Sequence, residues 1–396
     1  MTAATDIYYD PYDFDIDTDP YPVWKRMREE APLYYNERYD FYALSRFADV
    51  EEASTAWQTY SSAKGIQLEM VKRGHPVPPG LFIAEDPPEH DMHRLILSRA
   101  VTPRRVLALE PRIRELCAEY LDPHVGSGGF DLVDDFGAHL PMRVIGALVG
   151  IPEESQLDLR DKIEESARLK TAEMPAESQI GTIGTPYGAF LAYRRDHPAD
   201  DFLTTLIQAR FTDVFTGEER GLTDAEILNY VGMLYAAGNE TTARLIGWMG
   251  KILADNPEQR AAVVADPALI SPAVEETLRY EVPSPIQVRS MAKPAELYGR
   301  TVPEGATVAL LTGSANRDER AFDDPDTFNV RRKIDRHVTF GIGVHYCFGA
   351  ALARLEGRIA LEEILKRFPS WDVDPAGLEL IHTSTLRGYR KLPIVL

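Results

Sequence analysis

Cysteine is nearly absent from this sequence: only Cys117 and Cys347 occur among 396 residues. Two thiols cannot build the network of disulfides that stabilises small secreted proteins, which favours a reducing compartment. Positive charge is also scarce, because 43 lysines and arginines stand against 62 aspartates and glutamates, giving a net charge of −19. This balance argues against nucleic acid or an anionic membrane surface as a partner.

Long apolar runs, internal repeats and flexible linkers are absent as well. No window reaches the ~18 apolar residues that a membrane-spanning helix needs. The N-terminus is acidic and lacks the basic and apolar parts of a secretory signal. We therefore expect a cytoplasmic protein without a membrane anchor, built as one domain of residues 1–396 in which residues 1–19 form an N-terminal extension.

Helical patterns dominate what the sequence does contain, with a few short strands. We predict a helix from Pro20 to Glu30, a strand hairpin over residues 33–44, and a strand, turn and strand over residues 297–311. The longest helical pattern runs from Asp224 to Ala254 and is apolar on nearly all faces, which predicts a central position in the fold.

The predicted central helix begins with a capping box, Thr223 and Glu226, and carries the polar segment Gly238-Asn-Glu-Thr-Thr242 near its middle. Glycine there costs about 1 kcal/mol relative to alanine, and a buried glutamate costs more unless it is paired. A kink packed by polar neighbours is one explanation. A local rule that is broken in the core, however, usually marks a functional segment.

The second cysteine lies in Phe340-Gly-Ile-Gly-Val-His-Tyr-Cys-Phe-Gly349, directly before a helix-forming run from Ala350 to Phe368. Glycines let this backbone turn tightly and approach a flat ligand. Free N–H groups and the positive dipole at a helix N-terminus favour a thiolate, which suits a soft metal centre. Taken alone, the loop fits a metal ligand and a small buried cysteine equally well.

Two further predicted helices carry pairs of polar residues. One opens at Ser271-Pro272, a hydroxyl cap before a proline, and places Glu276 and Arg279 on one face, where apolar neighbours favour a buried pair. The other follows a pair of prolines and places His90 and Arg94 four residues apart. That face suits the binding of carboxylates, although a solvated basic face has the same spacing.

Together, these segments resemble the signature sequences of bacterial soluble cytochromes P-450, the haem-thiolate monooxygenases. The cysteine loop, Ala237–Thr242, the E-x-x-R pair and the His90/Arg94 pair match in order, and the likeness runs from about Pro20 to the C-terminus. The resemblance implies a single-domain, triangular, mainly α fold with small β-sheets. It also implies haem b (iron protoporphyrin IX), with the long central helix lying over it.

The resemblance further implies roles for individual residues. Cys347 is the expected iron ligand, and N–H groups around Phe348 and Gly349 would tune its sulfur. The expected propionate contacts are His90, Arg94, Arg289 and His345. The residues expected beside the macrocycle are Ala237, Gly238, Phe340, Gly341, Gly343 and Gly349.

Glu240 and Thr241 are the expected catalytic pair. The threonine hydroxyl would hold a network of oxygen and water, and the carboxylate would relay protons from solvent. Thr242 is expected to bond back to its own helix. Glu276 and Arg279 are expected to be structural, with a partner arginine near residues 329–332.

No flavin or iron–sulfur motif occurs in the chain, so by the same resemblance electrons would come from a ferredoxin and its NAD(P)H-dependent reductase. Basic residues near the cysteine loop and after the His90/Arg94 helix would steer an acidic partner, or are ordinary solvated charges. They are Arg99, Arg104, Arg105, Arg331, Arg332, Lys333, Arg336, Arg354 and Arg358.

The expected substrate is a hydrophobic small molecule, such as a terpenoid, a fatty chain or a small aromatic, which is hydroxylated or epoxidised. By resemblance its contacts come from residues 65–82, 167–187, 234–241, 285–288 and 383–385, and residues 166–187 have the composition of a mobile lid. Met233, Ile286 and Val288 indicate an apolar pocket, whereas Lys72, Arg73 and Lys170 would anchor a carboxylate or simply lie in solvent.

Three alternative functions remain open from the sequence. They are a non-catalytic haem sensor, a haem-thiolate reductase of nitrogen oxides that takes electrons directly from a reduced nicotinamide, and a haem-free helical binding protein. The Glu240–Thr241 pair argues against the first, because a passive haem site needs no proton relay.

Overall fold

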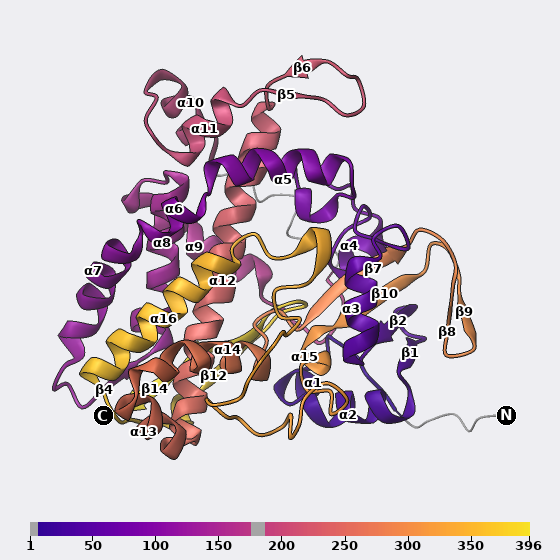
Figure 1. Cartoon of the computed structure of the whole chain (residues 1–396). Helices are drawn as coiled ribbons and strands as arrows, with labels where there is room; N and C mark the ends of the chain where they lie inside the picture. The colour runs from indigo at the N-terminus through magenta and orange to yellow at the C-terminus, as the bar shows by residue number, and fades with distance from the viewer. Residues whose placement is uncertain (1–6, 176–186) are drawn as a thin grey trace.

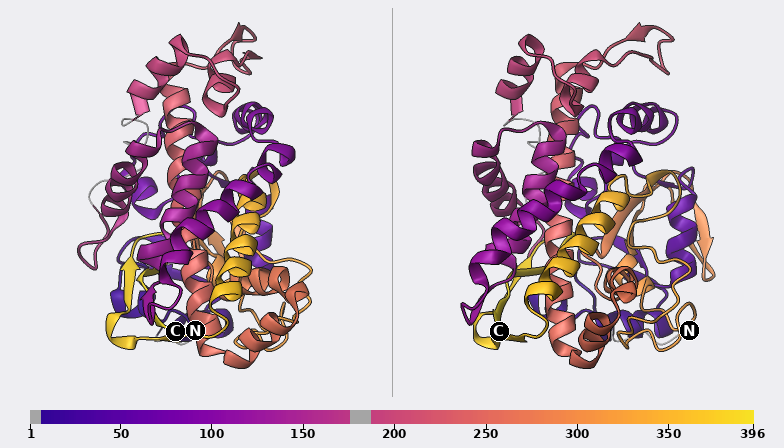
Figure 2. Two further views of the ribbon diagram at one scale, coloured as in Figure 1. Left: turned by 90° about the vertical axis from the view of Figure 1, so that its left-hand side faces the viewer. Right: turned by 60° about the vertical axis from the view of Figure 1, so that its left-hand side comes forward.

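A long central helix organises the molecule. The computed structural model describes residues 7–175 and 187–396. Helix α12 (Asp224–Asp255) runs through the middle, with most other helices on one side and the largest sheet on the other (Figure 1). It keeps this central position when the molecule is turned (Figure 2). The other α-helices of the described residues are α1 (Phe14–Thr18), α2 (Tyr21–Glu30), α3 (Phe47–Thr55), α4 (Leu68–Arg73), α5 (Glu89–Ala100), α6 (Pro103–Leu107), α7 (Glu110–Leu121), α8 (His139–Val149), α9 (Glu153–Ala167), α10 (Gly188–Asp196), α11 (Phe202–Gln208), α13 (Pro257–Ala265), α14 (Ile270–Tyr280), α15 (Thr312–Ala315) and α16 (Ala350–Arg367).

The strands form one five-stranded sheet and several smaller ones. The large sheet has the order β1-β2-β10-β7-β3, in which only β2 and β10 are parallel. Its strands are β1 (Leu33–Asn36), β2 (Phe41–Leu44), β3 (Tyr60–Ser61), β7 (Ile286–Met291) and β10 (Thr307–Leu311). The smaller sheets are β11-β14-β4 (Asp372–Val373, Pro393–Val395, Gly129–Asp131), β5-β6 (Phe211–Thr212, Glu219–Arg220), β8-β9 (Ala295–Leu297, Arg300–Val302) and β12-β13 (Glu379–His382, Arg387–Lys391).

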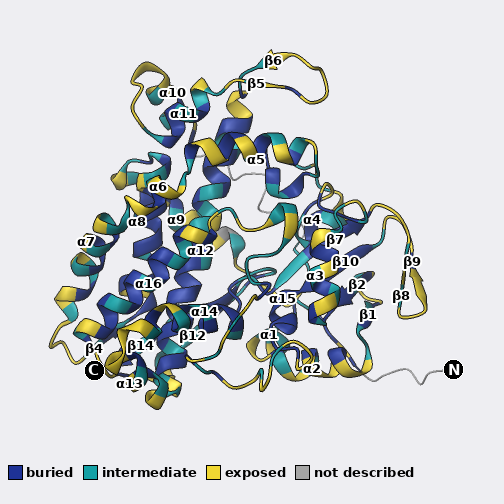
Figure 3. Ribbon diagram, viewed as in Figure 1, coloured by how far each residue is buried: buried dark blue, intermediate teal, exposed yellow. Residues whose placement is uncertain are grey.

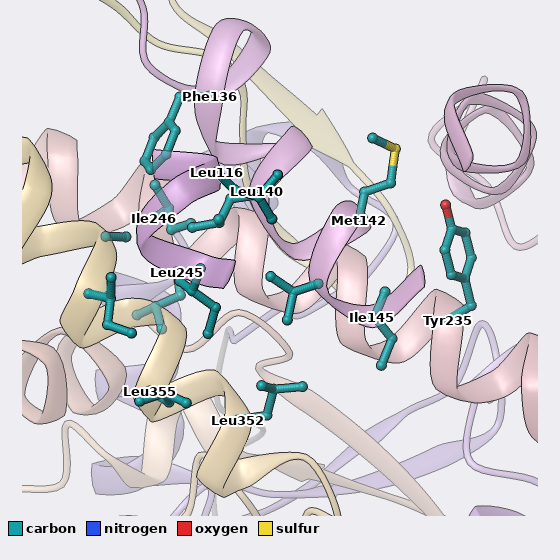
Figure 4. Packing of buried hydrophobic residues seen from close by; sticks show 14 of the residues in the cluster. Leu116, Phe136, Leu140, Met142, Ile145, Tyr235, Leu245, Ile246, Leu352 and Leu355 are labelled. Atoms are coloured by element: carbon teal, nitrogen blue, oxygen red, sulfur yellow. The ribbon is translucent and has the colours of Figure 1, made fainter. Parts of the chain in front are cut away.

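Burial on several sides explains why α12 lies at the centre. The predicted capping box is confirmed: the Thr223 hydroxyl accepts from the N–H of Glu226, and the Glu226 carboxylate accepts from the N–H of Thr223. Beyond this turn the helix is largely buried (Figure 3). Leu245 and Ile246 pack between α8 and α16 (Figure 4). The mainly helical fold with a long central helix is therefore confirmed.

One prediction about the start of a helix needs correction, and one about a strand pair gains detail. Helix α14 begins at Ile270, ahead of Ser271, and has no side-chain cap. A 3-10 turn (Pro267–Leu269), capped by Asp266, precedes it, so the chain is already helical when it reaches Ser271. In residues 297–311 the strands β9 and β10 flank a turn as predicted, but β9 pairs with β8 whereas β10 pairs with β2 and β7.

The described N-terminal residues pack into the fold. Tyr9 and Tyr12 are buried in a hydrophobic cluster with Trp24 and Phe41. The predicted lid, residues 166–187, includes residues 176–186, which lie outside the described part of the chain. Within the described part, no helix combines the length and apolar character that crossing a bilayer requires.

Candidate functional site

The cysteine loop is a tight turn that leads into α16. The N–H of Cys347 donates to the carbonyl oxygen of Phe340 at 2.7 Å, which closes the loop on itself. Gly341 and Gly343 have φ angles of +67° and +77°, a region that residues with a side chain rarely adopt. A side chain on Gly343 would also press on the backbone of Ser54 in α3. The glycines therefore set the path of the loop.

The Cys347 thiol has the N–H donors that the sequence predicted, but their effect on its pKa is smaller than that of burial. The N–H groups of Gly349 and Ala350 and the charges of Arg94 and Arg354 each lower its pKa. Burial raises the pKa more strongly, so that the net shift is upward. The residue nevertheless has exposed surface. An accessible thiol surrounded by protein needs a cation to become a stable thiolate.

Four cationic or hydrogen-bonding groups meet beside this loop. His90 and Arg94 come from α5, Arg289 from β7 and His345 from the loop itself. The rings of His90 and His345 lie 4.6 Å apart, and the buried Nε2 atoms of both have no hydrogen-bond partner in the described residues. Arg94 donates to the carbonyl oxygen of Tyr346 at 2.7 Å.

No described carboxylate forms an ion pair with Arg94 or with Arg289, which is only 6% exposed. Burial lowers the pKa of Arg289 to about 10. Burial, and then the charges of Arg289, His90 and Arg94, lower the pKa of His345 to about 3. Concentrated positive charge without an anion is costly in a buried place. The arrangement therefore fits an anionic group bound between α5, β7 and the loop.

The middle of α12 exposes one narrow strip. Ala237 is exposed, and Leu234 and Thr241 on the same face are half-buried, although most of the helix beyond them is buried. The Thr241 hydroxyl donates to the carbonyl oxygen of Ala237 at 2.7 Å, which leaves its lone pairs free to accept. The bond back to the helix, expected of Thr242, is thus made by Thr241. Thr242 is buried.

Gly238 does not share the exposed strip. A Cβ atom on this residue would lie 3.1 Å from Ile145 of α8, a residue that faces α12 in Figure 4. The expectation that Gly238 leaves space beside the cofactor therefore needs correction. Because consecutive helical residues point about 100° apart, Gly238 allows α8 to approach while Ala237 faces the open side.

Glu240 is buried and ion-paired. Its Oε2 accepts from Arg244 Nη2 at 2.7 Å, and Arg244 Nη1 donates to the carbonyl oxygen of Tyr389 at 2.8 Å. Glu164 of α9 lies 3.9 Å from Arg244. Burial raises the pKa of Glu240, Arg244 lowers it, and the charge of Glu164 raises it, with a net upward shift. The carboxyl is thus able to hold a proton at a higher pH than an ordinary glutamate.

The Glu276/Arg279 pair is buried, as predicted. Both oxygens of Glu276 accept from Arg279, at 2.7 and 2.8 Å, and both side chains are fully buried. Arg332 Nε donates to Glu276 at 3.1 Å, which confirms a partner within residues 329–332. The pair is part of the core.

Comparison with known proteins agrees with this arrangement. A family model described as Cytochrome P450 matches residues 190–385. Cytochrome P450 123 of Mycobacterium tuberculosis is 38% identical over 395 residues, which cover 98% of this chain and 97% of that protein. The chain belongs to the cytochrome P450 family. Erythromycin C-12 hydroxylase of Saccharopolyspora erythraea is 36% identical over 382 residues, covering 93% and 92%. A structure of a mutant of P450 EryK in complex with erythromycin B superposes with a TM-score of 0.85 at 34% identity, covering 96% of each chain.

Cytochromes P450 are haem-thiolate monooxygenases with haem b as cofactor, and the residues present here fit that group. A haem carries an iron that takes a thiolate and two propionates that need cationic partners. Cys347 offers the thiol. Arg94 and Arg289, which have no carboxylate partner among the described residues, and the unbonded Nε2 atoms of His90 and His345 offer partners for the propionates. Phe340, half-buried beside Arg354, and the open space at the Cα of Gly349 complete the surroundings of the thiol.

Sequence reasoning missed Arg244 as the partner of Glu240. The spacing of four residues on one helix was a usable signal. The carbonyl oxygen of Tyr389 and the carboxylate of Glu164 come from distant segments, so no local sequence pattern could predict these two contacts.

The basic surface of this cytochrome P450 is smaller than the sequence indicates. Most of the nine basic residues near the loop are ion-paired: Arg105 with Asp200, Arg332 with Glu276, Arg336 with Glu51, Arg354 with Glu275, and Arg358 with Glu110 and Glu362. Of these nine, only Arg99, Arg104, Arg331 and Lys333 make no ion pair with a described residue. Lys72 and Lys170 likewise pair with Asp40 and Glu165.

Glu356 of α16 leads to a prediction about pH. It is 1% exposed, and burial raises its pKa well above 4.5. The folded chain therefore keeps a proton that the unfolded chain loses above that pH. The free energy of unfolding should fall as pH rises from about 4.5 towards the raised pKa, by roughly 1.4 kcal/mol per pH unit. Glu356→Gln should flatten this slope in urea unfolding at pH 5–8.

Glu362 lies on the same helix, where it pairs with Arg358 and with Arg114 of α7, and it provides the control. Glu362→Gln should leave the slope unchanged. An unchanged slope in Glu356→Gln would show that Glu356 ionises normally.

Proposed function

We propose that this cytochrome P450 uses dioxygen and two electrons from a ferredoxin, itself reduced by an NAD(P)H-dependent reductase, to hydroxylate or epoxidise a hydrophobic small molecule. The observation that carries this proposal is the exposed strip of α12. There the hydroxyl of Thr241 lies beside exposed Ala237, and the buried acid Glu240 directly precedes Thr241 in the chain. A site that only stores or senses a ligand has no use for an alcohol next to a proton-holding acid.

In this proposal Cys347 binds the iron as a thiolate, with the N–H groups of Gly349 and Ala350 donating to the sulfur. His90, Arg94, Arg289 and His345 bind the propionates. Phe340, Gly341 and Ala237 border the macrocycle. When bound, the haem supplies the oxygen-activating chemistry of the family. The protein residues place the group, exclude water from it and deliver protons.

Glu240 is proposed to deliver those protons. Its raised pKa lets the carboxyl keep a proton at a higher pH than an ordinary glutamate, and Arg244 holds it in position at 2.7 Å. Glu164, 18% exposed at its side chain, connects this pair to solvent. The Thr241 hydroxyl, with free lone pairs, accepts from water at the other end of the path.

Replacing this acid gives a test of the relay. Glu240→Gln should lower kcat by roughly 10²-fold, the usual contribution of a positioned acid, and leave substrate affinity unchanged. In the wild type the rate should fall as pH rises through the raised pKa of Glu240, because only the protonated acid donates. This fall of the rate with rising pH should be absent in the variant. Rates of product formation measured over a series of pH values would show the difference.

Glu164→Gln tests the outer end of the same path, because this residue lies 3.9 Å from the same arginine. A smaller loss than in Glu240→Gln is expected. Equal turnover in Glu240→Gln and wild type would remove Glu240 from the reaction.

Ferredoxin is proposed as the electron donor, since the chain itself offers no flavin or iron–sulfur motif. The positive surface that would receive it is reduced to Arg99, Arg104, Arg331 and Lys333. With only four unpaired charges, the rate of reduction by ferredoxin should fall only moderately as the ionic strength rises. Arg99→Gln should slow reduction by a ferredoxin more than Arg358→Gln, whose charge is already neutralised by Glu110 and Glu362.

The proposed substrate remains a terpenoid, a fatty chain or a small aromatic, and the names of the relatives add erythromycin-like compounds. Apolar residues from the expected substrate segments share one cluster: Leu68, Leu169, Ile286 and Val288. Met233 belongs to a different cluster. We also propose that the whole chain forms one domain, which the large cluster from Met70 to Ile394 supports, and that it is cytoplasmic, which fits its two unpaired cysteines.

Product analysis with two electron sources tests the function. The haem-loaded protein is incubated with a hydrophobic compound that shifts its spin state, with ferredoxin, reductase and NADPH. An oxygenated product that takes its oxygen from labelled dioxygen is expected. Turnover of nitric oxide with NADH alone would instead identify a reductase of nitrogen oxides.

A further inference from the structure

A second group of chemically reactive side chains lies between α5 and the loop before it. Glu85, Glu89 and His93 each bring one possible ligand atom within 4.8 Å of the others. Glu89 and His93 are four residues apart on α5, and Glu85 reaches the same point from the loop after Phe82–Ala84. Glu85 and His93 are buried, at 6% and 1% exposed, and Glu89 is half-buried.

The charges of this group are not balanced by the protein. Glu85 is hydrogen-bonded to His93 Nδ1 at 2.7 Å. Among the described residues, no lysine or arginine pairs with Glu85 or Glu89. The nearby Glu226 is already neutralised by Arg220, at 2.9 and 3.0 Å. Burial, and then the charge of Glu85, raise the pKa of Glu89. Two adjacent carboxylates thus share at most one imidazole as counter-charge.

An independent observation also indicates a missing ligand. The hydroxyl of Tyr230 on α12 is fully buried and has no hydrogen-bond partner in the described residues. Its ring lies 5.7 Å from that of His93, and the charges of Glu85, Glu226 and Glu89 all act on the hydroxyl. The hydroxyl therefore lies within the electrostatic field of these carboxylates. The Nε2 of His93 likewise makes no hydrogen bond and lies 3.7 Å from Glu226.

We propose that Glu85, Glu89 and His93 bind a divalent transition-metal cation, with zinc as the best fit. Two carboxylates and an imidazole suit Zn²⁺, which is commonly held by three protein ligands and one water. Mg²⁺ prefers oxygen ligands alone. The Tyr230 hydroxyl is placed to bind the water. Binding replaces the proton between His93 and Glu85 with a cation shared by all three side chains.

The proposed ion would connect the loop before α5 to the helix itself. Glu89 and His93 directly precede His90 and Arg94, the two residues of α5 that face the cysteine loop. A cation at this point would therefore fix the first turns of α5, where those residues are presented. The ring of His93 packs on Phe211, which borders an open cavity of about 550 Å³ between α5 and the β5-β6 hairpin. The proposal does not depend on the substrate or electron donor.

Zinc binding to the full-length, haem-loaded protein tests the site. After dialysis against EDTA, competition with a fluorescent zinc chelator should reveal one tight site in the wild type. Glu89→Gln and His93→Gln should weaken it at least tenfold, and a tenfold excess of Mg²⁺ should not displace the zinc. Glu115→Gln, on the exposed face of α7, and His197→Gln, exposed directly after α10, are the matched controls and should bind like the wild type.

Haem content, measured on every variant, separates loss of the site from loss of the fold. Glu89→Gln keeps the shape of a half-buried side chain, so its haem content should stay normal. A second readout is the melting temperature, which zinc should raise in the wild type and leave unchanged in Glu89→Gln. Absence of a tight site in the wild type, or equal affinity in Glu89→Gln, would overturn the proposal and indicate carboxylates that share protons.

Discussion

The Cys347→His variant is expected to lose completely the absorption band that reduced cytochromes P450 show with carbon monoxide, and to lose turnover with it. The band depends on a thiolate donor, and an imidazole is a neutral and weaker one. The loop is built around sulfur: the N–H groups of Gly349 and Ala350 donate to it, and Arg94 and Arg354 lower its pKa. Difference spectra of the reduced protein with and without carbon monoxide provide the measurement.

Cys117 offers a control for this experiment. It is fully buried in α7, and burial raises the pKa of its thiol to about 12, so it is an inert core residue. Cys117→Ala should keep the band and lose only some stability. A band that survives in Cys347→His, or disappears in Cys117→Ala, would show that Cys347 is not the ligand.

The parts of the site that could be predicted are those whose physical requirements are local. The cysteine loop is such a part, because its glycines, its thiol and the following helix are consecutive, and Gly341 and Gly343 do adopt positive φ angles. The capping box of α12 and the buried Glu276/Arg279 pair also depend on neighbours within four residues. The turn at the glycines, the capping box and the burial of the pair were each predicted correctly.

The features that sequence reasoning missed depend on packing between distant segments. Gly238 was expected to leave space beside the cofactor. In the structure its missing side chain instead leaves space for Ile145 of α8. The thiol of Cys347 was expected to favour the thiolate, but the burial that outweighs its N–H donors comes from the whole fold. Neutralisation of the basic surface by Glu51, Glu110 and Glu275 likewise joins residues far apart in the chain.

Glu276→Ala is expected to destabilise the protein by about 3–5 kcal/mol and to leave most of it without haem, because it strands a buried charge. Arg279 and Arg332 would both lose their carboxylate. Arg279 also donates to the carbonyl oxygen of Asn316, and the side chain of Asn316 binds the N–H of Val338 and the hydroxyl of Thr339. The pair is thus connected by hydrogen bonds to the residues that open the cysteine loop.

Glu275, the preceding residue, provides the control that assigns the loss of stability and haem to the buried pair. It pairs with Arg354 and His337, which lower its pKa to about 2, but its side chain is 31% exposed. Because water screens this pair, Glu275→Ala should cost only about 1 kcal/mol and keep the haem. Urea unfolding and the ratio of haem to protein would measure both effects. Normal haem content and stability in Glu276→Ala would show that the cysteine loop holds its shape without this pair.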